Sequence, residues 1–178
     1  LNLSAAFKMI DKVDTKIEES IDYAFDNQYG YLTACPTNLG TGMRASAMLH
    51  LPGLVLSDQV NKVIQAVNKI GLAVRGLYGE GTEALGNLFQ VSNQHTLGEP
   101  ENEIIARLEK VIKQIIEHEE NAREKLYDDN RTTLDDKIGR SYAILRYGHI
   151  ISTKEALDLL SMLRLGVDLG YFSDELRG

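Results

Sequence analysis

Apolar residues recur at steps of three and four over the first 26 residues, the spacing of one face of an amphipathic helix. The positions are Leu3, Phe7, Ile10, Val13, Ile17, Ile21 and Ala24. This pattern predicts one helix over residues 1–26, followed by a strand over 29–35 and a Gly- and Pro-rich loop over 36–42. Residues 43–51 then alternate between apolar and polar, which predicts a strand with one buried face. Arg44 falls on the polar face.

A second helical stripe covers residues 60–70 and is made by Val60, Val63, Ile64, Val67 and Ile70. Ser57 or Asp58 is placed to cap its start, and Gly71 is placed to end it. A short strand over 72–74 then leads to Arg75, a glycine-rich loop covers 76–86, and a further strand is expected over 87–92. Strands joined by both loops and helices indicate an α+β fold.

The second half of the chain is helical in pattern. One stripe runs for about 25 residues through Ile104, Ile105, Leu108, Val111, Ile112, Ile115, Ile116 and Ala122. Thr133 with Asp136, and Ser152 with Glu155, resemble capping boxes and predict helices over 134–147 and 153–165. We therefore expect an antiparallel sheet flanked by helices over residues 1–130, followed by a small α-helical domain over 131–178.

Composition excludes several classes of protein. Charged residues make up 25% and hydrophobic residues 43% of the 178 residues, which is ordinary for a globular protein, and no segment reads as a membrane helix or a secretory signal. The net charge of -7 argues against direct nucleic-acid binding. The single cysteine, Cys35, fits a reducing cytoplasm. The chain begins at Leu1 and not at Met, which we interpret as processing or truncation.

Arg44 and Arg75 are the only arginines among the first 100 residues, and each adjoins a glycine-rich segment. Arginine binds phosphate through a planar fork of donors, and neighbouring glycines let the backbone approach a ligand closely. The two residues are therefore candidate phosphate ligands. From spacing alone, a surface ion pair for each arginine is the more frequent alternative.

Glu80 and Cys35 are two further candidates, each with two interpretations. Glu80 lies in the glycine-rich loop, where its carboxylate either faces solvent or meets a cationic ligand. Cys35 precedes a proline at a predicted strand end, as a reactive thiolate or as a small buried apolar residue. For an isolated cysteine, the buried interpretation is the default. His95, His118 and His149 are too scattered to propose a metal site.

Two segments resemble the ATP:guanido phosphotransferases, the phosphagen kinase family. Residues 35–45 read CPTNLGTGMRA, which is similar to the family signature C-P-[ST]-N-L-G-T-G-L-R-A. Residues 75–84 read RGLYGEGTEA, which is similar to the family's R-G-x-x-G-E-x-[ST]-E-A loop, and residues 91–93 match the strand that follows. Two long motifs in the right order are far more specific than either alone.

The resemblance implies a role for each candidate. Arg44 and Arg75, with Gly76 and Gly79, would bind the phosphates of ATP. Cys35 would line the guanidinium pocket and Glu80 would contact the guanidinium, so these two are the expected catalytic residues. Mg²⁺ would bridge the phosphate oxygens, and no covalent enzyme intermediate is expected.

Departures from the small-molecule members point to one branch of the family. Met48 stands where those enzymes usually place a nucleotide-contacting His, and Gln90 where they usually place an Asp. The loop sequence, residues 31–34 and the helical region after residue 130 resemble the bacterial protein arginine kinases, which phosphorylate arginine side chains of proteins. The family's upstream segment with its main catalytic glutamate has no counterpart here, so we expect this chain alone to be nearly inactive.

Further expectations follow from the resemblance. Partners would be protein substrates with exposed arginine, a zinc-finger activator protein, a Clp ATPase that receives the marked substrates, and a stress-gene repressor. A homodimer or higher oligomer is left open. One alternative is a kinase for free arginine or another small guanidino compound. Another treats the helical residues 101–178 as a protein-interaction module, with an acidic run of Glu117, Glu119, Glu120 and Glu124 that is more simply a solvated helix face.

Overall fold

The N-terminal segment is a helix followed by a small hairpin. The computed structural model of the chain describes residues 2–77 and 84–172. Helix α1 (Leu3–Glu18) is capped by Asn2, whose side chain accepts the Ala5 N–H at 2.8 Å. The helix ends at Glu18, so the prediction of one helix over residues 1–26 is wrong for residues 19–26.

A tight turn at Asp26 follows α1 after a short connecting segment. The Asp26 carboxylate accepts the N–H groups of Gln28 and Tyr29, which folds the chain back on itself. Strands β1 (Phe25–Asp26) and β2 (Gly30–Tyr31) pair across this turn. The strand expected over 29–35 is confirmed only in these two residues of β2, and the loop that follows contains a short 3₁₀ turn, η1 (Pro36–Asn38).

A three-stranded antiparallel sheet forms the centre of the fold. Its strands are β3 (Ser46–His50), β4 (Leu72–Gly76) and β5 (Leu88–Asn93), in the order β3-β5-β4. The strands predicted over 43–51, 72–74 and 87–92 are confirmed, with shifted ends. Their alternating residues bury one face against helices, and the core on that face includes Ala47, Leu49, Leu72, Phe89 and Val91.

Three further helices contribute to the core beside the sheet. Helix α3 (Val60–Lys69) ends as expected, with Gly71 at φ +77°, but its first residue is preceded by Gln59, which makes no side-chain cap. Helix α2 (Pro52–Leu56) was not predicted, because five residues are too few to show a helical period. Helix α4 (Glu101–Asp129) packs Ile105, Leu108 and Ile112 on the same core as α3.

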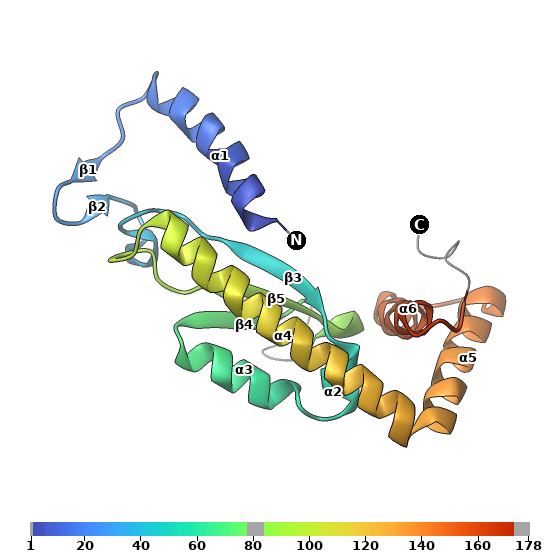
Figure 1. Cartoon of the computed structure of the whole chain (residues 1–178). Coiled ribbons are helices and arrows are strands. Elements are labelled where there is room, and N and C mark those ends of the chain that lie inside the picture. Colours follow the sequence, from blue (N-terminus) through green and yellow to red (C-terminus); the bar gives the residue numbers. More distant parts are fainter. Residues whose placement is uncertain (1, 78–83, 173–178) are drawn as a thin grey trace.

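The last two helices gather at the far end of α4, as Figure 1 shows. They are α5 (Arg131–Tyr147) and α6 (Thr153–Asp168). The predicted Ser152 cap is confirmed, since its side chain accepts the Glu155 N–H at 3.2 Å. The cap at Thr133 is wrong, because α5 begins directly after Asn130. A second, smaller core contains Leu134, Ile138 and Leu165.

The architecture confirms the expected α+β class, with helices against one face of an antiparallel sheet. Among the described residues, no helix combines the length and the apolar composition that crossing a bilayer requires.

Candidate functional site

Arg44 and Arg75 are presented on the sheet face that the helices leave uncovered. Arg44 precedes β3 and is exposed, while Ala47 and Leu49 of the same strand point into the core. Arg75 pairs with Gln90 in the sheet, and Gln90 also pairs with Met48. Because paired residues of adjacent strands point to the same face, these three side chains form one row. The expectation that Arg44 lies opposite the core is confirmed.

Both guanidinium groups lack a carboxylate partner within the described residues. Arg44 Nη2 donates to the Ser92 hydroxyl at 3.4 Å, and no ion pair of Arg44 or Arg75 occurs in the parts of the chain that the structure describes. The surface-ion-pair alternative therefore finds no support there. Gly76 ends β4 opposite Phe89, while Gly79 and Glu80 lie outside the described residues.

Asn93 fixes the backbone around Arg44. Its side chain is 4% exposed, its Oδ1 accepts the Ala45 N–H at 2.8 Å, and its Nδ2 donates to the carbonyl oxygens of Met43 and His95 at 3.0 Å. A buried amide with all three bonds satisfied holds one backbone geometry. Sequence reasoning gave Asn93 no role of its own, and its only signal was a polar residue at the end of an apolar strand.

Thr96 supports the segment before Arg44 in the same way. Its buried hydroxyl lies 3.0 Å from the Thr37 carbonyl oxygen and 2.6 Å from that of Leu39. One hydroxyl hydrogen can serve only one acceptor at a time, so the two bonds alternate. The loop that carries Cys35 is thereby tied to the chain that leaves β5.

Cys35 is exposed, so the interpretation of this residue as a buried apolar side chain is wrong. Its Sγ lies 3.0 Å from Thr37 Oγ1, at the start of η1. Hydrogen bonds from the Thr37 side chain, and then from its backbone, lower the pKa of Cys35, because they favour the thiolate. Cys35 is thus an accessible thiol on the segment that leads to Arg44, with surroundings that favour its thiolate form.

A cavity of about 660 Å³ lies between α1 and the segment that leads into β3. Arg44 and Thr33 line it from one side, and the carboxylates of Asp11, Asp14 and Glu18 line it from α1. The guanidinium of Arg44 and these three carboxylates therefore line the same cavity.

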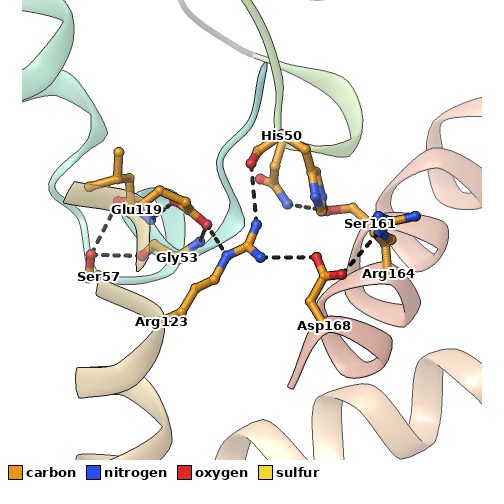
Figure 2. A network of polar contacts seen from close by, with 10 residues as sticks. His50, Gly53, Ser57, Glu119, Arg123, Ser161, Arg164 and Asp168 are labelled. Carbon is orange, nitrogen blue, oxygen red and sulfur yellow. Dashed lines mark hydrogen bonds and ion pairs between the residues drawn. The ribbon is translucent and has the colours of Figure 1, made fainter. Parts of the chain in front are cut away.

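A different arginine, Arg123, is the centre of a buried network between α4, α2 and α6 (Figure 2). Its Nε donates to Glu119 Oε1 at 2.6 Å and its Nη1 to Asp168 Oδ2 at 3.0 Å. Glu119 also accepts the N–H groups of Gly53 and Leu54 at 2.8 and 2.9 Å. Because Glu119 is 4% exposed, the interpretation of the acidic run as a solvated face is wrong at this residue.

Residue 53 is a glycine because the backbone of α2 passes close to Arg123 and Glu119. A Cβ placed on Gly53 would lie 2.9 Å from Cγ of Arg123 and 3.0 Å from Oε1 of Glu119. The first distance is shorter than real Cβ contacts and the second is very tight, so Arg123 or Glu119 would have to move. The approach of the α2 backbone to the ion pair thus depends on the absence of a side chain at residue 53.

Models of protein families match the chain in two places. Residues 1–122 match "ATP:guanido phosphotransferase, C-terminal catalytic domain", and residues 131–177 match "Protein-arginine kinase McsB C-terminal domain".

Curated relatives match nearly the whole chain. A protein-arginine kinase of Caldanaerobacter subterraneus subsp. tengcongensis is 52% identical over 99% of the chain, and that of Bacillus mycoides is 55% identical over 96%. These matches cover 52% and 48% of the two relatives, so the chain spans about half the length of the curated relatives it matches.

Solved structures with a similar fold include two kinases of small guanidino compounds. Substrate-free taurocyamine kinase from Schistosoma mansoni gives a TM-score of 0.56 at 32% identity, over 67% of this chain and 15% of that one. Lombricine kinase gives 0.57 at 31% identity, over 67% and 33%.

Proposed function

The chain belongs to the ATP:guanido phosphotransferase family, and we propose that it forms part of a kinase that transfers the γ-phosphoryl group of ATP to arginine side chains of proteins. The observation that carries this proposal is the pair Arg44 and Arg75 on one open sheet face, with no carboxylate partner among the described residues. A guanidinium that is not already neutralised within the protein is suited to bind phosphate.

The two arginines fit the phosphates of a nucleotide. A phosphoryl group in transfer spreads negative charge over its oxygens, and fixed cations lower the barrier because they need no rearrangement as the charge develops. Arg44 is held by the saturated amide of Asn93, and Arg75 by its place in β4. Mg²⁺ would arrive with the nucleotide, since it is usually held by substrate phosphates and water, and would offset part of the phosphate charge.

The guanidino side of the reaction needs groups that attract and orient a cation. The polarised thiol of Cys35 suits this role, because its lowered pKa favours a negative sulfur. Glu80 keeps the role that the family resemblance implies, contact with the substrate guanidinium. A carboxylate there would orient the attacking nitrogen and help remove its proton.

The nucleotide base is expected to be bound differently from that in the small-molecule kinases. Met48 and Gln90, the two departures noted in the sequence, are direct partners across β3 and β5. Gln90 Nε2 donates to Ser46 Oγ at 3.0 Å. Both departures therefore alter the same spot of the open face.

A chimera tests the proposal. The chain replaces the matching half of the Bacillus mycoides protein-arginine kinase, with which it shares 55% identity, and transfer of ³²P from γ-labelled ATP to an arginine-rich protein is measured. We expect Arg44→Ala and Arg75→Ala each to lower the rate by about 100- to 1000-fold, because each removes a fixed donor to the transferring group.

Arg140→Ala is the matched control, since the Arg140 side chain is 74% exposed and its ion pair with Asp136 is long, at 4.0 Å. It should leave the rate within about twofold, as is usual for a surface change. Equal rates for all three variants would refute the phosphate role of Arg44 and Arg75.

Free arginine separates the proposal from its closest alternative, a kinase for small guanidino compounds such as those acted on by the taurocyamine and lombricine kinases. Excess free arginine should barely compete with a protein substrate. If the chimera phosphorylates free arginine at a comparable rate, the small-molecule alternative is correct. The partner proteins and the cytoplasmic location expected from the resemblance remain predictions.

A further inference from the structure

Helix α6 contacts the turn η2 (Leu85–Asn87), which leads into β5. The Gly86 N–H donates to Asp158 Oδ1 at 2.9 Å. Gly86 has φ +61°, and a Cβ placed on it would lie 2.9 Å from the carbonyl oxygen of Leu157. The backbone of the turn therefore rests directly on the backbone of α6.

Ser161, one turn further along α6, binds the next residue of the same turn. Its hydroxyl is 2.7 Å from Asn87 Nδ2 and 2.8 Å from His50 Nε2, and Ser161 is 5% exposed (Figure 2). Burial, and then the charge of Arg123, lower the pKa of His50 to about 4, so its imidazole is neutral at physiological pH. Ser161 can then accept from Asn87 and donate to His50, which satisfies all three groups.

These contacts continue to the strand end that presents Arg75. The Leu85 N–H donates to the Leu77 carbonyl at 3.1 Å, and the Leu77 N–H donates to the Leu88 carbonyl at 2.9 Å. Leu77 follows Gly76, the last residue of β4. Gly86 and Asn87 both have positive φ angles, +61° and +55°, and the turn is closed by the Leu88 N–H, which donates to the Leu85 carbonyl oxygen. A residue other than glycine keeps such a conformation only where surrounding contacts hold it, so the contacts from α6 help to set the geometry of the turn.

We propose that Asp158 and Ser161 are positioning residues for the phosphate site, through which helix α6 sets the placement of Arg75. This inference rests on the proposed function, because it takes Arg75 to be a phosphate ligand. Helix α6 would then contribute to nucleotide binding through η2, without itself contacting the nucleotide. A displacement of about 1 Å at a phosphate ligand is enough to weaken its effect greatly.

A double-mutant cycle tests the proposal with the full 178-residue chain, using ATP affinity measured by calorimetry in the presence of Mg²⁺. In the parent, we expect Ser161→Ala to weaken ATP binding by about 10-fold and Asp158→Ala by about 3- to 10-fold. In an Arg75→Ala background, both should change the affinity by less than about twofold, because the residue they position is gone. A merely structural role would give the same loss in both backgrounds.

Two further variants complete the design. Asp158→Asn keeps an acceptor oxygen for the Gly86 N–H, so its affinity should stay within about threefold of the parent. Asp136→Ala removes a carboxylate of α5 that is 68% exposed and should leave the affinity unchanged.

The outcomes separate the two claims. If Arg75→Ala weakens binding but Ser161→Ala and Asp158→Ala do not, the positioning role is wrong and the proposed function stands. Losses of equal size in both backgrounds also overturn the positioning role. If Arg75→Ala has no effect on ATP affinity, the phosphate role of Arg75 fails and the inference fails with it.

Discussion

Arg123 and the pair Arg44 and Arg75 show two different surroundings of the same side chain in one molecule. Each of the three guanidinium nitrogens of Arg123 has a partner, two carboxylates and the carbonyl oxygen of His50. Arg44 and Arg75 are exposed and have no carboxylate partner within the described residues. A guanidinium that is neutralised by carboxylates of its own protein holds elements together, whereas one without such a partner is suited to bind an outside anion. The arrangement of partners, and not the residue type, separates structure from ligand binding.

The largest effect is expected where the saturated network is broken. Glu119→Ala removes a buried carboxylate that binds Arg123 and the N–H groups of Gly53 and Leu54. We expect a loss of about 3–5 kcal/mol in the free energy of unfolding, because the charge of Arg123 and both N–H groups lose their partner. Urea unfolding followed by circular dichroism measures this loss.

Glu120→Ala is the matched control, since Glu120 is exposed and adjacent in the same helix. Its cost should be within about 0.5 kcal/mol. Similar costs for the two variants would mean that the network does not hold the helices together.

A smaller effect is expected from the protonation of His50. Its folded pKa of about 4 lies below the ordinary 6.5, so the stability gained from the neutral ring is complete above pH 6.5 and is lost as the pH falls towards 4. Arg123 and Arg164 oppose the protonated ring and Asp168 favours it. Between pH 6.5 and 4 we expect His50 to lower the free energy of unfolding by about 1–2 kcal/mol, a figure discounted for partial solvent exposure of the ring.

His50→Gln isolates this contribution. Other groups also titrate between pH 7.5 and 4.5, but they do so in both proteins, so the difference in unfolding free energy between parent and variant reports on His50. That difference should shrink as the pH is lowered. A difference independent of pH would show that His50 is not kept neutral by its surroundings.

The smallest effect on stability is expected at the open face. Arg44→Ala and Arg75→Ala should each change the free energy of unfolding by no more than about 0.5 kcal/mol, because neither side chain is buried or ion-paired among the described residues. The same urea experiment measures both. A loss above about 2 kcal/mol would make these arginines structural and would end the contrast with Arg123.

The sequence predicted the sheet and the long helices well, because their apolar periods extend over many residues. It failed where a few hydrogen bonds decide the structure. Helix α1 ends at Glu18 although the apolar spacing continues to Ala24, and the chain then turns where Asp26 accepts the N–H groups of Gln28 and Tyr29. The first N–H groups of α2 are satisfied by the buried carboxylate of Glu119, far along the chain. No local pattern contains that information.

The site was predicted in part for the same reason. Motifs identified the family, which the comparisons confirm. The alternation of apolar and polar residues over 43–51 placed Arg44 on the sheet face opposite the core, as the structure has it. Asn93, Asp158 and Ser161 were missed, because the hydrogen bonds that set them apart reach segments distant in sequence. The roles expected for the site residues remain predictions; these residues are Cys35, Arg44, Arg75, Gly76, Gly79 and Glu80.

Gly53 extends the set of positions at which the network of Arg123 and Glu119 restricts substitution. It carries no charge and no side chain, yet even the Cβ of alanine would crowd Glu119 and Arg123 and force one of them to shift. In a saturation mutagenesis map, this glycine should be as intolerant as the ion pair itself, so the genetic footprint of the network would be larger than its list of polar residues.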